Sequence, residues 1–244
     1  MYTVMRIFKH LKSDWFRYGF ETLAVVVGIL AAFALENWRD SLRVKKEEQE
    51  ILINMFSDLQ DAKQQSSSLI DVELQSRKYL ISALDQQLPD GSLHEDFYID
   101  SIFYYVIWSL EMGVPVINSY SDIKNTGKSG LITNEQIRQR FTNLELNIHN
   151  LRNQIDDRLR VHQLRIDGIS VTDLNYVRLI SFRNQELSTA NESPNDYEYI
   201  LKDKKIRNLI AIKLNLSNSV IMYRRALDAE IDSLIALLEE EIKD

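Results

Sequence analysis

The sequence lacks cysteine altogether, and it contains only 7 glycines and 3 prolines among 244 residues. Without cysteine the chain has no disulfide, no thiolate metal site and no cysteine nucleophile. Scarce glycine and proline disfavour a turn-rich β architecture. An excess of positive charge is also missing, because the net charge is -7, and phosphate backbones require a basic face. We therefore predict an all-α protein that does not bind nucleic acid.

The motifs of several enzyme classes are incomplete or absent. The stretch NTGKSG (125–130) has the Gly-Lys-Ser end of a nucleotide-binding loop, but Asp122 stands where the first glycine of that loop is required. A carboxylate there would repel a triphosphate. No Gly-x-Ser-x-Gly or His-Glu-x-x-His pattern occurs, and the four histidines are scattered along the chain. The sequence thus predicts no catalytic residue, no metal ligand and no cofactor, and we expect a protein that is not an enzyme.

One long apolar segment is present near the amino terminus, in FRYGFETLAVVVGILAAFALENW (16–38). Residues 22–35 carry no charge, and about 20 helical residues are enough to cross a bilayer. Aromatic residues flank the segment at Trp15, Tyr18 and Trp38, which is typical of anchors at the membrane interface. We predict a transmembrane helix over residues 20–38, and the lipid bilayer as a partner.

The same segment leaves two questions open. A cleaved signal peptide is the alternative, because a basic region precedes it and Ala32-Phe33-Ala34 matches a small-x-small cleavage pattern. The orientation of the helix depends on the basic residues of the arm 1–19. A short basic arm more commonly stays on the cytoplasmic side of the membrane. We expect this arm in the cytoplasm and the domain of residues 39–244 in the periplasm, on a single-pass protein of a bacterial inner membrane.

After residue 38 the chain is predicted to form long helices separated by short turns. Apolar residues recur at spacings of three and four over residues 41–87, 134–165 and 204–242. Three such stripes indicate that residues 39–244 form an antiparallel helical bundle with coiled-coil character. The apolar residues of the last stripe are Leu209, Ile212, Leu216, Val220, Tyr223, Leu227, Ile231, Leu234 and Leu238.

Two stretches, GFETLAVVVGILAAFALENW (19–38) and SYSDIKNTGKSGLITNEQIRQRF (119–141), carry a resemblance to a known family. Together they resemble a domain-of-unknown-function family of uncharacterised single-pass bacterial membrane proteins, with a Gly-Glu, Gly-Ile and Asn-Trp anchor. Phe20 separates Gly19 from Glu21, which the family pattern usually places side by side. The resemblance implies a membrane anchor and a helical domain outside the cytoplasm, without an activity or catalytic residues.

Three groups of residues are candidates for a function. Glu21 is an ionisable residue at the membrane entry and could handle an ion, although a pairing with Arg17 one turn away is the plainer interpretation. The small residues Ala24, Gly28 and Ala32 could let two membrane helices associate. The plainer interpretation of that spacing is chance.

The third candidate is a ligand groove beside Tyr120, Lys124 and Lys128, and its alternative is a helix connection filled by its own side chains. The resulting hypothesis is a non-enzymatic sensor or scaffold that binds a protein or envelope partner. An alternative function is an oligomeric channel or transport accessory built around Glu21 and the small-residue face.

Overall fold

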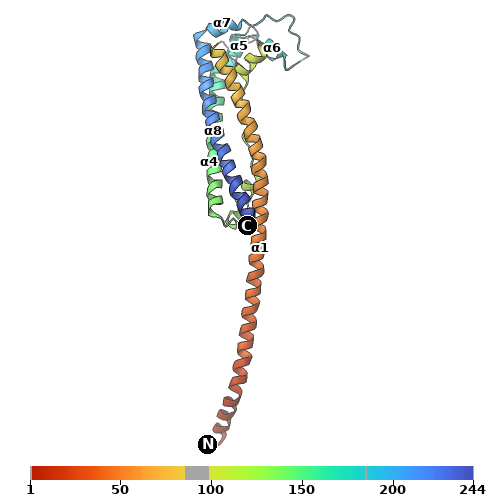
Figure 1. The fold of residues 1–244 in the computed structure, drawn as a ribbon, viewed down its shortest axis with the longest axis vertical. Coiled ribbons are helices and arrows are strands. Elements are labelled where there is room, and N and C mark those ends of the chain that lie inside the picture. The colour runs from red at the N-terminus through yellow and green to blue at the C-terminus, as the bar shows by residue number, and fades with distance from the viewer. Residues whose placement is uncertain (1, 86–98, 185, 244) are drawn as a thin grey trace. The chain divides into compact units, whose positions relative to one another are not determined.

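The computed structural model describes the backbone of residues 2–85, 99–184 and 186–243, and the side chains of these residues from Gly19 onward. All regular structure in these ranges is helical, so the all-α prediction is confirmed for the described chain (Figure 1). The chain divides into two compact units, residues 1–51 and residues 52–244. Each unit is described by itself below.

The first unit consists of the amino-terminal part of helix α1, which spans Tyr2–Asp85. Its apolar window is long enough to cross a membrane by length and composition, and none of that window is buried. Large apolar side chains are exposed throughout it, from Phe20 at 74% to Leu35 at 63%. The predicted membrane segment is therefore a single helix that presents apolar side chains in every direction.

The second unit contains the rest of α1 and all the later helices. These are α2 (Asp100–Phe103), the π-helix η2 (Tyr104–Trp108), α3 (Asn118–Asn125), the 3-10 helix η3 (Lys128–Leu131), α4 (Glu135–Val161), the π-helix η4 (His162–Ile166), α5 (Asp167–Thr172), α6 (Tyr176–Ser181), α7 (Tyr197–Lys202) and α8 (Lys204–Lys243). Helix α7 begins at Tyr197, where the Asp196 side chain accepts the Tyr199 N–H and caps the helix.

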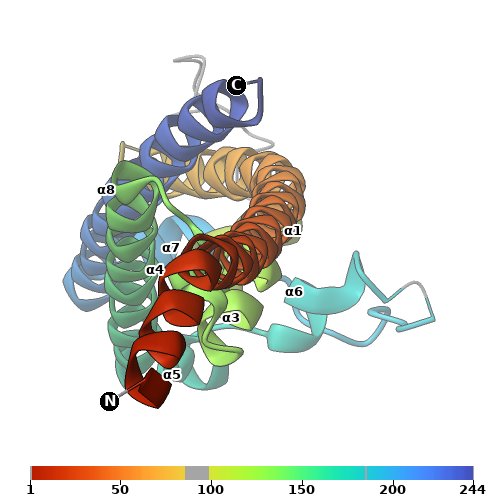
Figure 2. The ribbon, with the colours of Figure 1, turned by 90° about the horizontal axis from the view of Figure 1, so that it is seen from below.

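Helices α4 and α8 pack along each other, as Figures 1 and 2 show. Arg140 near the start of α4 contacts Glu230 near the end of α8 at 3.0 Å, so the two helices run in opposite directions. Helix α1 is likewise joined to α8 in reverse order, because Lys63 bonds Asp228 at 2.8 Å and Arg77 bonds Asn218 at 2.7 Å. The long helices of the second unit are thus tied together along their length.

The buried residues of α8 recur at alternating spacings of four and three, as in a heptad repeat. The apolar members include Ile206, Ile210, Val220, Leu227, Ile231, Leu234 and Leu238, each no more than 6% exposed. Three predicted stripe residues, Ile212, Leu216 and Tyr223, are only half-buried. The true seam passes one position away from each, through Lys213, Ser217 and Arg224.

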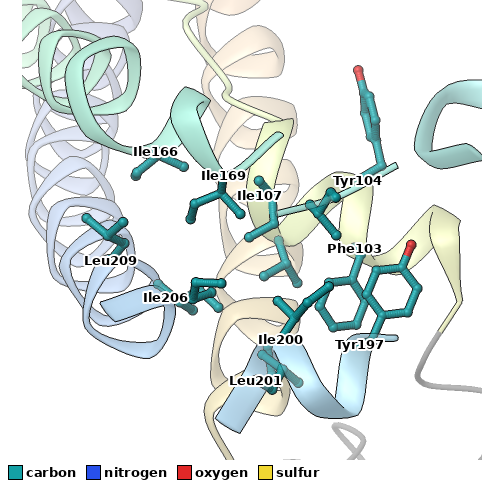
Figure 3. Close-up of a cluster of buried hydrophobic side chains, with 14 of the residues drawn as sticks. Phe103, Tyr104, Ile107, Ile166, Ile169, Tyr197, Ile200, Leu201, Ile206 and Leu209 are labelled. Atoms are coloured by element: carbon teal, nitrogen blue, oxygen red, sulfur yellow. The ribbon is translucent and has the colours of Figure 1, made fainter. Parts of the chain in front are cut away.

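The short helices meet the long ones in an apolar cluster (Figure 3). Phe103 stacks on Tyr197 with ring centroids 3.7 Å apart, and Ile206 of α8 lies in the same cluster. Full burial of such side chains contributes about 1.5–3 kcal/mol each. This cluster therefore fixes α2 and α7 against the start of α8.

Candidate functional site

The interior of the second unit contains four charged side chains that are almost inaccessible to solvent. Glu73 of α1, Arg158 of α4, and Lys213 and Arg224 of α8 are each at most 2% exposed. We call these four residues the buried charged cluster. Because buried charge is costly unless it is paired and hydrogen-bonded, the partners of each group decide what the cluster can do.

Glu73 is the acidic member of the cluster and lies between the two arginines. Its Oε1 accepts a hydrogen bond from Arg158 Nη1, and its Oε2 lies 3.9 Å from Arg224 Nε. Within the described chain, Glu73 Oε2 and both Nε and Nη2 of Arg224 have no hydrogen-bond partner. One carboxylate therefore serves two buried guanidinium groups, and it accepts a hydrogen bond only from Arg158, whose own Nε has no partner in the described chain.

The remaining partners of the buried cations are backbone carbonyls of residues 105–113. Lys213 Nζ donates to the carbonyl oxygens of Val106 at 2.9 Å, Ile107 at 3.0 Å and Ser109 at 2.8 Å. Arg224 donates to the Gly113 carbonyl at 2.9 Å, and Arg158 to the Glu111 carbonyl. Side chains from two helices thus hold one short stretch of backbone through its carbonyl oxygens.

These carbonyls are available because the helix stops early. The π-helix η2 ends at Trp108, and residues 109–117 are not helical. Pro115 cannot donate a helical hydrogen bond and disfavours helix at the residue before it. The last turn of a helix leaves carbonyl oxygens without N–H donors, and cations are favoured at this negative end of the helix dipole. Lys213 supplies both donors and charge there.

Burial and neighbouring charge shift the protonation of two groups in this interior. Burial, together with the positive charge of Arg158, lowers the pKa of Lys213 to about 7. Burial, with Lys213 and Arg158 adding to it, lowers the pKa of His162 to about 4. Lys213 therefore titrates near neutral pH while His162 stays uncharged there.

His162 opens the second π-helix, η4, and is 5% exposed. Its Nε2 lies 3.0 Å from Asp167 Oδ1, and its ring packs edge-on against Trp108 with centroids 6.3 Å apart. Burial raises the pKa of Asp167. π-Helices insert one extra residue into a helical turn and are frequent at functional sites, and the two irregular turns η2 and η4 meet here through Trp108 and His162.

Two ionisable groups of the cluster are engaged in contacts within the fold. Lys213 is surrounded by carbonyl oxygens, and Glu73 is paired with arginine. Among the described side chains, no group of three or more His, Asp or Glu residues is placed to hold a metal ion. The cluster fixes the path of residues 105–113 between the long helices.

The predicted membrane residues lie in the first unit. Trp38 is 62% exposed, whereas the side chains of Trp15 and Tyr18 lie outside the described residues. Glu21 is exposed, and Ala24, Gly28 and Ala32 are exposed on the same helix. A methyl group added at Gly28 would meet no atom within 4 Å, so this face of the helix is open.

The predicted ligand groove residues are held against α4. The Tyr120 ring stacks on Phe141 with centroids 4.5 Å apart, and Lys124 Nζ bonds both carboxylate oxygens of Glu145 at 2.8 and 2.9 Å. Lys128 follows in η3, after Gly127, whose φ of 71° allows the tight turn expected there. Tyr120 and Lys124 are thus brought together on α4, and the proposed ligand contact stays a prediction.

Sequence reasoning missed the buried charged cluster. Arg158 is buried, whereas the apolar Leu159 beside it is only half-buried. A signal was available, because Arg158 and His162 continue the heptad spacing of Ile137, Phe141, Leu144, Leu151 and Ile155, and Lys213 and Arg224 continue that of α8. The predicted stripes contained only apolar residues, so the charged residues in register with them were not predicted to be buried.

Comparison with known proteins found no matching family model, no similar curated protein and no similar solved structure. The resemblance to a family of uncharacterised membrane proteins therefore stays a prediction, and the function is argued from the two units alone.

Proposed function

We propose that this chain is a single-pass membrane protein whose helical domain acts by binding a partner or ligand rather than by catalysis. The observation that carries the proposal is the exposed apolar surface of α1 over residues 20–35. Monomeric soluble proteins rarely expose contiguous apolar patches of more than a few hundred Å². A helix that is apolar on all sides and unburied requires an apolar surrounding, which a bilayer supplies.

Residues 39–244 then form the functional domain, built as an antiparallel bundle in which α8 opposes α1 and α4. The heptad spacing of the buried residues and the reversed pairing of Arg140 with Glu230 support this architecture. The basic residues Arg6, Lys9, Lys12 and Arg17 support an amino terminus in the cytoplasm and a domain in the periplasm.

Membrane insertion is tested by alkaline carbonate extraction and flotation of the full-length protein. The wild-type chain is expected to stay in the membrane fraction. Two arginines in the span, Val26→Arg with Ile29→Arg, cost about 2.5–3.5 kcal/mol each at the centre of a bilayer, so this variant is expected in the soluble or aggregated fraction. The matched control, Gln60→Arg with Gln64→Arg, places the same charges at exposed positions of the second unit. Release of the wild-type protein by carbonate would refute the anchor.

The intact mass of the purified protein decides between an anchor and a cleaved signal peptide. An anchor leaves the full mass of 28.6 kDa, whereas cleavage after Ala34 removes the first 34 residues.

The orientation in the membrane is measured by cysteine labelling. An introduced cysteine is labelled specifically, because the chain has no cysteine of its own. An impermeant maleimide is expected to modify Ser188→Cys and not Thr3→Cys in cells with a permeabilised outer membrane.

Light scattering of the protein in detergent tests the channel alternative. A monomer or dimer agrees with the binding function proposed here. A closed ring larger than a dimer, together with loss of ion flux on Glu21→Gln, would overturn it in favour of a channel or transport accessory.

A further inference from the structure

The second unit has a groove of about 440 Å³ between α1 and α8. It is lined by Leu74 and Arg77 of α1 and by Asn218, Ile221, Met222 and Arg225 of α8. Sites for small molecules usually enclose about 300–1,000 Å³. The groove therefore has room for a small ligand, and none of the sequence candidates lies in it.

The floor of the groove is apolar. Leu74 and Ile221 lie along it, and Met222 is 59% exposed although it is a large apolar side chain. Methionine is flexible and polarisable, so it adapts to ligands of different shape. This floor suits a short alkyl chain.

One end of the groove has an oriented set of hydrogen-bond donors. Arg77 Nε donates to Asn218 Oδ1 at 2.7 Å, which fixes the plane of the guanidinium and turns the amide NH₂ of Asn218 away from that bond. The bond uses one of the five N–H donors of the arginine. A planar guanidinium held in this way is suited to bind a phosphate or a carboxylate through two parallel hydrogen bonds.

The charge of the groove favours a ligand of opposite charge. Two arginines and no acidic residue line it, although the whole chain has a net charge of -7. Glu73, the neighbour of Leu74, is paired with Arg158 in the interior. Arg225 lies seven residues beyond Asn218, which is two helical turns or about 10 Å along α8. Both ends of the apolar floor are thus basic.

We propose that this groove binds a small amphiphilic anion. A phosphate or carboxylate headgroup is held by Arg77 and the Asn218 amide, and a short alkyl chain covers Leu74, Ile221 and Met222 toward Arg225. The proposal deepens the binding function proposed above, on which it rests, by giving the ligand class. A lipid phosphate and a fatty-acid carboxylate share this chemistry, and the experiment distinguishes them.

Binding is measured by calorimetry on the full-length protein in nanodiscs of zwitterionic lipid, with octyl phosphate as the probe below its micellar concentration. Affinity is expected to rise about fourfold for each methylene added from butyl to octyl phosphate, in line with burial of the chain. Arg77→Gln is expected to weaken octyl phosphate binding at least tenfold, because it removes a charge-assisted hydrogen bond. The matched control Arg152→Gln, at an exposed position of α4, is expected to bind like the wild type.

Three further ligands establish the charge that the groove prefers and the source of its ligand. Octyltrimethylammonium has the same chain with a cationic head and is expected not to bind. If octanoyl lysophosphatidylglycerol binds more tightly than octanoate, the site is supported and its ligand is a lipid phosphate. If octanoate binds more tightly, the site is supported and its ligand is a fatty acid. Equal binding of octyl phosphate to the wild type and Arg77→Gln, or no saturable binding of any anion, would overturn the proposal.

The outcome is independent of membrane insertion. If carbonate releases the protein, the same titrations are made in aqueous buffer, so failure of the anchor and failure of the groove are read separately. Circular dichroism of Arg77→Gln confirms that any loss of binding occurs in a folded helical protein.

Discussion

At the scale of single residues, Glu73 has the largest electrostatic role. It is the only carboxylate in direct ion-pair contact with the buried Arg158 and Arg224 among the described residues. Removing one partner of a buried ion pair leaves an uncompensated charge in a low-dielectric interior, which costs far more than the pair itself contributes. The stability of the second unit should therefore depend strongly on this one side chain.

Glu73→Gln is expected to lower the free energy of unfolding by about 3–5 kcal/mol. The measurement is chemical unfolding followed by circular dichroism in a neutral detergent. Glu198→Gln serves as the control, because Glu198 pairs with Lys202 at the surface with both side chains 65% exposed, and such pairs contribute at most about 1 kcal/mol. Similar losses in the two variants would contradict the role given to Glu73.

Lys213 makes the stability depend on pH in a defined window. In the unfolded chain it binds a proton up to about pH 10.5, and in the folded chain only up to about pH 7. Between these values the unfolded state holds the extra proton, so the contribution of Lys213 to stability increases as the pH rises. The carbonyl oxygens around Lys213 oppose the decrease in its pKa, because they favour the charged form of the lysine.

The test compares the wild type with Lys213→Met. The free energy of unfolding of the wild type, minus that of Lys213→Met, is expected to increase by about 2 kcal/mol between pH 7 and pH 9. A difference that is flat over this range would show that the carbonyls keep the lysine protonated. A control titration of Lys205→Met, at an exposed position, should be flat.

At the scale of elements, the non-helical segment 109–117 depends on close packing against α1. A methyl group added at Gly113 would lie 2.7 Å from Leu69 Cδ2 and 2.9 Å from Glu111 Oε1. Its amide also donates to Glu111 Oε1 at 2.7 Å, and Gln65 accepts the N–H of Val116 at 3.1 Å. The segment thus has little freedom to move away from the helix.

Gly113→Ala is expected to destabilise the protein by about 1–3 kcal/mol, as overpacking does in well-packed interiors. Gly168→Ala is the matched control, because a methyl group at that helical position meets no atom within 4 Å. It is expected to stabilise by about 0.5–1 kcal/mol through the gain in helix propensity. Thermal unfolding of both variants measures the difference, and equal melting temperatures would contradict the packing argument.

The helices also show how much of the fold could be predicted from the sequence alone. Helix α8 was predicted over 204–242 and spans Lys204–Lys243, because a long seam of apolar residues has one dominant period. The break after Trp108 was not predicted, since residues 102–108 are all apolar or aromatic and such a run does not show where the helix ends. That break depends on Lys213, Arg158 and Arg224, which are distant in the sequence. The groove at Arg77 was missed for the same reason.

At the scale of the whole molecule, the second unit has an apolar core of its own. Leu52 and Met55, which are 1% and 0% exposed, belong to this core together with residues of α4 and α8. None of the apolar window of the first unit is buried. The domain should therefore hold its structure without the anchor.

A fragment of residues 39–244 is expected to be soluble without detergent, helical, and cooperative in thermal unfolding. Its melting temperature should lie within a few degrees of that of the full-length protein. Circular dichroism and sedimentation check this expectation. An aggregated or non-cooperative fragment would show that the first 38 residues take part in the fold.

The carbonyl oxygens of residues 105–113 have a consequence for the order of folding. Their donors on α8, Lys213 and Arg224, lie 104–111 residues later in the chain. Ribosomal synthesis delivers the carbonyls first, and loop closure over such separations is slow compared with local helix formation. Until α8 is synthesised, the carbonyl oxygens that Lys213 and Arg224 bind in the native state have only water as a partner from this set. We therefore expect completion of α8 to be a late step in the folding of the domain.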